Sequence, residues 1–153
     1  MNSSIIHLTN GDIALCSPDK FEKLSGFVWF PLKARNTTYA GRSECGITIR
    51  MHHDIAGKTR IDHVNGNGLD NRIENLRPAS ASQNAMNSRK LSKAYSSFKG
   101  VSYHKRDNRW VGKIQVNGTA IHLGNFKEEK DAAIAYNNAA TKYFGEFSRI
   151  NTI

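Results

Sequence analysis

The sequence predicts an α+β fold with a strand-rich N-terminal part, a short strand–turn–strand–helix segment, and a small antiparallel sheet backed by one helix. Short apolar runs separated by Asn, Gly and Pro fill the first sixty residues, which is typical of short strands. A Gly-rich turn separates two more such runs near the middle of the chain. Towards the C-terminus, three alternating segments precede a helical stripe of alanine and aromatic residues.

The N-terminal part is expected to be a set of strands with one helix. Strands are expected over residues 5–8 and 13–15, because Asn10-Gly11-Asp12 between them is a hairpin signal. Ser17-Pro18-Asp19 predicts the start of a helix that runs to Leu24, since proline suits the first helical turn. Further strands are expected over residues 28–30, 38–40 and 47–51, with a loop over residues 41–46.

The central segment predicts two strands around a tight loop, followed by a helix. The strands are expected over residues 61–64 and 73–76, around Asn65-Gly66-Asn67-Gly68. Pro78 should end the second strand, and Ser80 or Ser82 can cap a helix that runs to about Ser88. The polar, basic stretch that follows has no period and predicts a linker over residues 91–97.

The last part predicts three strands and one amphipathic helix. Strands are expected over residues 100–104, 109–116 and 119–124, with turns at Asp107-Asn108 and Asn117-Gly118. Between Lys127 and Phe144, one stripe of a helix is expected to be buried. The stripe consists of Ala132, Tyr136, Ala139, Ala140 and Tyr143.

Composition indicates a polyanionic partner and argues against a membrane protein. The 153 residues carry a net charge of +9, which agrees with nucleic acid binding without demonstrating it. Apolar runs are far shorter than the roughly 20 residues of a membrane span, and the N-terminus lacks the pattern of a signal peptide. Cys16 and Cys45 are isolated, which disfavours a disulfide framework or a thiolate zinc site. We therefore expect a cytoplasmic protein that is not secreted, with a monomer preferred although the sequence leaves the oligomeric state open.

A carboxylate, an imidazole and two amides are spaced regularly through the central segment. Asp62 and His63 are adjacent, Asn75 follows the histidine by twelve residues, and Asn84 follows nine residues later. Hydrolysis of a phosphodiester needs a base for water, for which histidine is suited. A hard cation bound by oxygen ligands can neutralise the developing charge. These residue types predict metal-assisted phosphodiester hydrolysis.

At this spacing DHVNGNGLDNR and ENLRPASASQN resemble the HNH (ββα-metal) nuclease motif of phage and intron-encoded homing endonucleases. The resemblance implies that Asp62 and Asn84 bind one divalent cation, Mg²⁺ foremost with Mn²⁺ as an alternative. It also implies that His63 is the general base and that Asn75 orients it.

Other histidines and arginines near the motif have open roles. Met51-His52-His53 resembles the upstream His-Arg pair of the HNH family, with His53 in place of the arginine, so a structural and a functional role are both open for His52 and His53. Arg72 and Arg77 are candidate phosphate contacts, with solvated surface charge as the alternative. We do not expect His7, His104 or His122 to bind metal.

The C-terminal segment resembles the plant APETALA2-type DNA-binding domain over nearly its whole length. The matching pieces are Lys99-Gly100-Val101, Trp110, IHLGNF from Ile121, the alanine-rich helix and Phe144-Gly145. The resemblance implies a three-stranded sheet whose exposed face lies in the major groove. Alternation directs six side chains to the helix, namely Val101, Tyr103, Trp110, Ile114, Ile121 and Leu123. The predicted DNA contacts are Lys99, Ser102, His104, Lys105, Arg106, Arg109, Lys113, Gln115 and His122.

Taken together, the sequence predicts an HNH nuclease domain over residues 1–90, a linker over 91–97 and a DNA-binding domain over 98–153. The expected function is metal-dependent cleavage of double-stranded DNA, with sequence selection aided by the C-terminal domain. The alternative is a non-catalytic DNA-binding regulator with a vestigial HNH core. A zinc-stabilised structural module is disfavoured because cysteine ligands are lacking.

Overall fold

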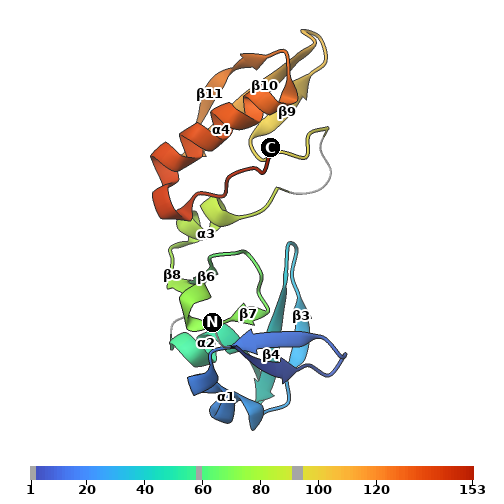
Figure 1. Ribbon diagram of the computed structural model, residues 1–153, viewed down its shortest axis with the longest axis vertical. Coiled ribbons are helices and arrows are strands. Elements are labelled where there is room, and N and C mark those ends of the chain that lie inside the picture. The colour runs from blue at the N-terminus through green and yellow to red at the C-terminus, as the bar shows by residue number, and fades with distance from the viewer. Residues whose placement is uncertain (1–2, 58–59, 91–94) are drawn as a thin grey trace. The chain divides into compact units, whose positions relative to one another are not determined.

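The computed structural model describes residues 3–57, 60–90 and 95–153 and has the α+β character that the sequence predicts (Figure 1). It divides the chain into two compact units, Met1–Asn84 and Ala85–Ile153. The division lies within helix α3 (Ala81–Asn87). Of the predicted linker, residues 91–94 lie outside the described residues. No helix in the described ranges is long and apolar enough to cross a membrane.

The N-terminal hairpin and helix form as predicted. Strands β1 (Ser4–His7) and β2 (Ile13–Cys16) pair in antiparallel fashion. Helix α1 (Pro18–Ser25) follows with Ser17 at its N-cap and proline in its first turn. On its other side β2 pairs in parallel with the two-residue strand β7 (Asp70–Asn71). This pairing connects the N-terminal hairpin to the central segment.

A second antiparallel sheet joins β3 (Phe30–Lys33), β4 (Thr38–Glu44) and β5 (Ile47–Arg50). The expected loop over residues 41–46 is wrong, because β4 continues to Glu44 and pairs with β5. The turn is confined to Cys45 and Gly46, which both have positive φ, at 50° and 77°. A two-residue turn of this kind matches the twist of paired strands.

The start of β3 and the end of β5 also differ from prediction. The sequence predicts a strand over residues 28–30, but β3 begins at Phe30, after the buried Trp29. At the other edge, Met51 starts a short helix, α2 (Met51–Ala56), instead of ending a strand. Arg42 on β4 ties this helix to the sheet through Asp54, with its Nε 2.6 Å from Oδ2.

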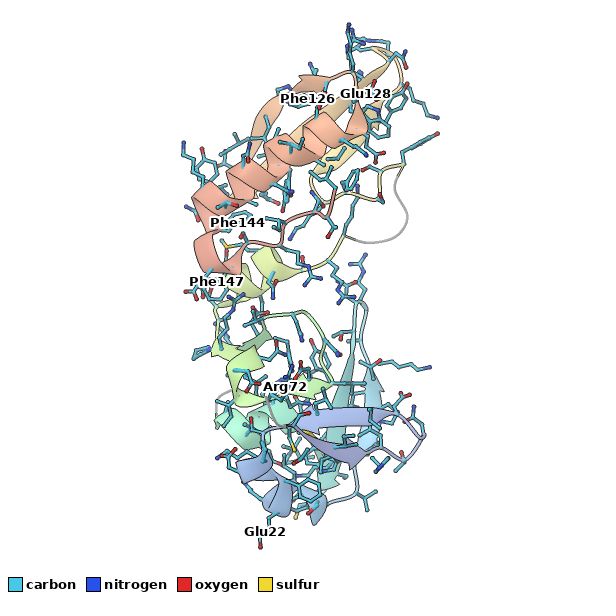
Figure 2. The ribbon with its side chains drawn as sticks, viewed as in Figure 1. Glu22, Arg72, Phe126, Glu128, Phe144 and Phe147 are labelled. Carbon is cyan, nitrogen blue, oxygen red and sulfur yellow. The ribbon has the colours of Figure 1, made fainter. Side chains whose placement is uncertain are left out.

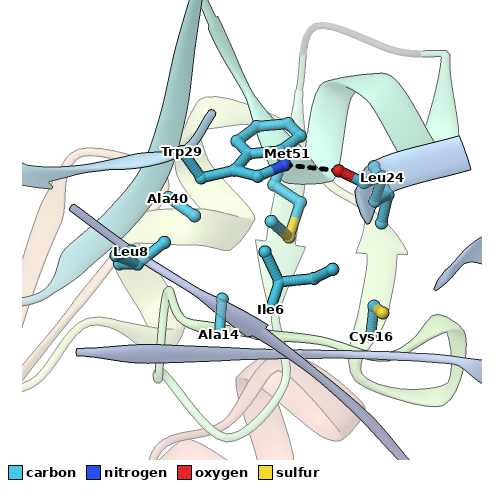
Figure 3. Close-up of a cluster of buried hydrophobic side chains, with 8 residues drawn as sticks. All are labelled: Ile6, Leu8, Ala14, Cys16, Leu24, Trp29, Ala40 and Met51. Carbon is cyan, nitrogen blue, oxygen red and sulfur yellow. Dashed lines mark hydrogen bonds between the residues drawn. The ribbon is translucent and has the colours of Figure 1, made fainter. Parts of the chain in front are cut away.

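The core of the N-terminal unit is a cluster of small and large apolar side chains (Figure 3). Its members are Ile6, Leu8, Ala14, Cys16, Leu24, Trp29, Ala40 and Met51. The Trp29 indole N–H donates to the Leu24 carbonyl at 2.8 Å, which satisfies its only polar group inside the core. Because Cys16 and Met51 belong to this cluster, the core fixes β2 and α2, the two elements next to the central segment.

The central segment forms a short strand pair followed by a helix. β6 (Ile61–His63) pairs in antiparallel fashion with β8 (Leu76–Pro78). Residues 73–75, expected in a strand, form a 3₁₀ turn instead. Helix α3 begins as predicted after Ser80. The Ser80 Oγ accepts from the Gln83 amide at 3.2 Å and Gln83 Oε1 accepts from the Ser80 amide at 2.7 Å, a capping box.

The C-terminal unit contains a three-stranded antiparallel sheet, as predicted. Its strand order is β11 (Thr119–Phe126), β10 (Arg109–Val116), β9 (Val101–His104). Helix α4 (Glu129–Phe144) packs against it (Figure 1). Figure 2 marks Phe126 and Glu128 before this helix and Phe144 at its end.

The buried stripe of α4 largely follows the prediction. Ala132, Tyr136, Ala139 and Ala140 are buried as expected. Tyr143, however, is 43% exposed, and the neighbouring Phe144 is buried in its place. The stripe therefore ends one residue later than the spacing indicated, at the last turn of the helix.

Candidate functional site

His63 is a buried imidazole whose Nε2 contacts an asparagine side chain. It is 5% exposed at the end of β6. Its Nε2 lies 3.2 Å from the Asn71 Oδ1. Because an amide oxygen can only accept, this contact assigns the proton to Nε2 and leaves Nδ1 as the basic nitrogen. Burial lowers the pKa of His63, although the Asn71 contact and the Asp62 charge oppose this. The ring is thus neutral near pH 7 and can accept a proton.

Asn71 is a site residue that the sequence reasoning missed. It is 0% exposed and lies on β7, opposite Cys16 of β2. Within the part of the chain that the structure describes, its Nδ2 has no hydrogen-bond partner. The sequence offers no spacing signal for it, since parallel pairing with the N-terminal hairpin places it beside His63.

Asn75 fixes the chain that directly follows His63. Its backbone carbonyl accepts from the Val64 amide at 2.9 Å. Its side-chain Oδ1 accepts from the Asn65 amide at 3.0 Å, and its Nδ2 donates to the Asp70 carbonyl at 2.7 Å. These bonds hold both ends of the loop after β6. A direct role in orienting the His63 ring stays a prediction.

Asp62 is held by an arginine on the paired strand. The two residues are cross-strand partners in the β6–β8 register. The Arg77 Nη2 lies 2.7 Å and its Nε 2.9 Å from the Asp62 Oδ2. Both side chains are largely buried, with 14% and 7% exposed, so the pair is shielded from solvent. Arg77 therefore places the carboxylate next to His63, and its predicted phosphate contact stays a prediction.

A second ion pair stabilises the Gly-rich loop. Arg72 contacts both oxygens of Asp70, at 2.8 and 2.7 Å, and this pairing lowers the pKa of Asp70. The Asn65 Nδ2 also donates to Asp70, at 2.8 Å. Arg72, labelled in Figure 2, thus has a structural partner. Its contact with phosphate is still a prediction.

His52 lies against the His63 ring, and His53 lies against His52. The His52 ring centroid is 4.9 Å from that of His63 and 4.3 Å from that of His53, both nearly perpendicular. Tyr39 packs on His52 at 5.3 Å. Burial, followed by the charges of the two other histidines and of Arg50, lowers the pKa of His52 to about 3. His52 is therefore neutral near pH 7, where it packs against His63.

Asn84 lies half-buried on α3, with its amide hydrogen-bonded to the Ser80 carbonyl at 3.0 Å. The helix directly follows β8, the strand that carries Arg77. Among the residues with a described position, no cluster of three His, Cys, Asp or Glu side chains could hold a metal ion. A site built on one carboxylate and one amide, as the motif implies, would not form such a cluster.

The predicted DNA-facing side chains of the C-terminal sheet are exposed. Ser102, His104, Lys113, Gln115 and His122 are all exposed, whereas Val101 and Ile114 on the helix side are buried. Near the first turn, Lys105 and Arg106 are exposed and Arg109 is half-buried. Trp110, Ile121 and Leu123 also pack with residues of α4, as expected. Tyr103 is half-buried and packs against Tyr95 and Trp110. Contact with DNA stays a prediction. Charge is also uneven, because residues 85–153 contain twelve Lys and Arg against five Asp and Glu, a net +7 of the total +9.

Comparisons with known proteins find relatives of both the HNH and the AP2 kind. The HNH endonuclease family model matches residues 51–86, which span α2 to α3. An uncharacterized HNH endonuclease of Acanthamoeba polyphaga mimivirus is 28% identical over 98% of this chain and 83% of its own length. The AP2-like ethylene-responsive transcription factor TOE2 of Arabidopsis thaliana is 30% identical over 74% of this chain but only 23% of its own length. Protein 3.8 of Escherichia phage T7 is 34% identical over 38% of this chain and 48% of its own length.

Proposed function

We propose that this chain, whose architecture combines an HNH segment with an APETALA2-type segment, is an endonuclease that hydrolyses phosphodiester bonds in duplex DNA. The observation that supports the proposal most directly is His63. It is buried, neutral, anchored at Nε2, and adjacent to the Asp62 carboxylate. A histidine that serves only packing has no need of a carboxylate neighbour and a dedicated amide partner.

His63 acts as the general base in this proposal. Nδ1 takes the proton of the water that attacks the phosphorus, since Nε2 is occupied by Asn71. The imidazolium that forms is stabilised by the negative charges of Asp62 and Asp70, which raise the affinity of His63 for a proton. Asn71 keeps the ring in one orientation and one tautomer, and Asn75 fixes the chain after it. The two asparagines are positioning residues.

Asp62 and Asn84 would hold the divalent cation, with Mg²⁺ as our first expectation. Carboxylate and amide oxygens are the hard ligands that such ions accept, so the donor set fits. When bound, the cation neutralises charge on the phosphate and on the leaving oxygen. Arg77 fixes the Asp62 carboxylate on β6, at the end of which His63 lies.

The C-terminal unit would supply most of the affinity for DNA. Its net charge of +7 favours contact with the phosphate backbone. The exposed Ser102, Lys113, Gln115 and His122 offer hydrogen-bonding groups suited to base edges in the major groove. Base selection by this sheet would therefore be separate from the chemistry at His63.

A supercoiled plasmid incubated with the protein and Mg²⁺ tests the proposal. We expect conversion to open-circle or linear DNA, complete inhibition by EDTA, and recovery when excess Mg²⁺ is restored. Asp62→Ala should abolish Mg²⁺ binding in calorimetry, while Asp19→Ala, an exposed carboxylate on α1, should not. A plasmid that stays supercoiled although the protein binds it would favour the non-catalytic regulator instead.

A further inference from the structure

A pocket of about 340 Å³ lies in the C-terminal unit, formed by the chain before β9 and the chain after α4. Four of its lining residues are basic, namely Arg89, Lys90, Lys99 and Arg149, and no described lining residue is acidic. Ser97 and Thr152 add hydroxyl groups. None of the exposed sheet residues predicted to contact bases takes part. This is a second basic surface of the unit.

Two of the four cations are held rigidly by backbone carbonyls. The Lys90 Nζ donates to the Phe98 and Val101 carbonyls, both at 2.7 Å. The Lys99 Nζ donates to the carbonyls of Met86 and Ser88, the latter at 2.7 Å. An ammonium has three N–H donors, so each lysine keeps at most one for a ligand. The lysines are therefore fixed in position before any ligand arrives.

Burial lowers the pKa of both lysines in the pocket. Burial, and to a lesser extent the charge of Arg149, lowers the pKa of Lys99 to about 8. Burial also lowers the pKa of Lys90, and the charge of Glu129 partly offsets this. Partly buried ammonium groups that face another cation are stabilised by an anion.

We propose that this pocket binds a phosphate group of the DNA backbone. The inference rests on the proposed function, because it assumes DNA as the partner. Arg and Lys with hydroxyl and amide donors are the groups that bind DNA phosphates. A volume above about 300 Å³ is enough for a small ligand, so a phosphate with its adjoining sugar fits. The contact fixes the position of the unit on the duplex without reading its bases.

The test is the salt dependence of DNA binding by the full chain. Binding is measured as the fluorescence anisotropy of a labelled duplex. Arg89 is exposed, and Arg89→Gln removes one charge from the pocket. We expect the slope of log K against log salt to decrease by about 1, with equally weaker binding to unrelated sequences. Lys142→Gln removes the same charge from an exposed position on α4 outside the pocket and should leave the slope unchanged.

Three outcomes would overturn the inference. Equal slopes for wild type and Arg89→Gln would exclude a contact between the pocket and a DNA phosphate, while DNA binding and cleavage by the wild type would keep the proposed function. The slope could stay unchanged while inorganic phosphate, added at constant ionic strength, shifts the amide NMR signals of Phe98 and Lys99. That result would assign the pocket to a free phosphate compound. Failure of the wild type to bind DNA would end both proposals together.

Discussion

Mild acid should destabilise the N-terminal unit, because His52 is neutral in the folded protein. The side chain is 3% exposed. Burial, together with the smaller effects of His63, His53 and Arg50, lowers its pKa from 6.5 to about 3. The Tyr39 ring covers it from β4. The neighbouring charges that act on the pKa of His52, those of His63, His53 and Arg50, all lower it.

The size of the effect follows from the two pKa values. In the unfolded chain His52 titrates near 6.5, so the unfolded state takes up a proton between pH 7 and pH 5 that the folded state excludes. The contribution of His52 to the free energy of unfolding is complete above pH 6.5 and falls as the pH drops towards 3. Each pH unit costs about 1.4 kcal/mol, so the free energy of unfolding should fall by about 2 kcal/mol between pH 7 and pH 5.

Urea unfolding monitored by Trp29 fluorescence measures this free energy for the N-terminal unit alone. The chain has two tryptophans, so Trp110→Phe leaves Trp29, which is 1% exposed in the N-terminal core. In this background, His52→Gln should lose the 2 kcal/mol pH dependence. His63 has a shift of the same sign but is present in both proteins. The same pH dependence with and without His52 would refute the reasoning.

Three further predictions concern the site and the C-terminal unit. Asn71→Asp places a carboxylate at Nε2 of His63 and raises the pKa of that histidine, so the acid limb of the kcat/KM profile should move to higher pH. If the limb does not move in a protein whose Trp29 fluorescence shows an intact fold, Asn71 does not position His63. Arg77→Met removes two donors from the largely buried Asp62 and should lower the free energy of unfolding by about 3 kcal/mol in the Trp29 assay, and a loss under 1 kcal/mol would show that solvent reaches the carboxylate. Gly100→Ala should destabilise the C-terminal unit by at least about 3 kcal/mol in thermal melting, because φ is +75° and the added Cβ would overlap the Tyr136 ring; Gly118→Ala, with φ +81° and open space, should cost only about 1 kcal/mol, and equal losses would contradict the packing argument.

Much of the fold could be predicted because the relevant signals are local. The first hairpin follows from its Asn-Gly turn, and α3 follows from Ser80 and Gln83 at capping-box spacing. The last helix follows from a periodic stripe that packs on alternating strands. These elements need no knowledge of distant residues, which is why they agree with the sequence pattern.

The errors arise where tertiary contacts override local preference. Residues 41–44 are polar and look like a loop, but pairing with β5 extends β4 through them. The helix α2 has no periodic apolar pattern and is held by the ion pair between Arg42 and Asp54. Such contacts join segments that a local pattern treats separately.

The candidate site also contains residues that a local sequence pattern indicates and residues that only tertiary contacts bring into place. The Asp-His-Asn-Asn spacing could be found in the sequence because the four residues lie in one continuous segment. Asn71 could not, since it reaches His63 only through the parallel pairing of β7 with β2. The ion pair between Asp62 and Arg77 depends on the β6–β8 register. The sequence pattern places the second strand over residues 73–76 instead of Leu76–Pro78, so it does not indicate this pair.

The most direct test is single-turnover cleavage of bound DNA by His63→Ala, with and without added imidazole. If His63 is the base, DNA affinity should stay near that of wild type while the cleavage rate falls by at least about 100-fold. Imidazole should restore part of the rate in the variant and leave wild type unchanged, and His7→Ala, at an exposed position on β1, should cleave normally. Cleavage by His63→Ala at the wild-type rate would contradict the account.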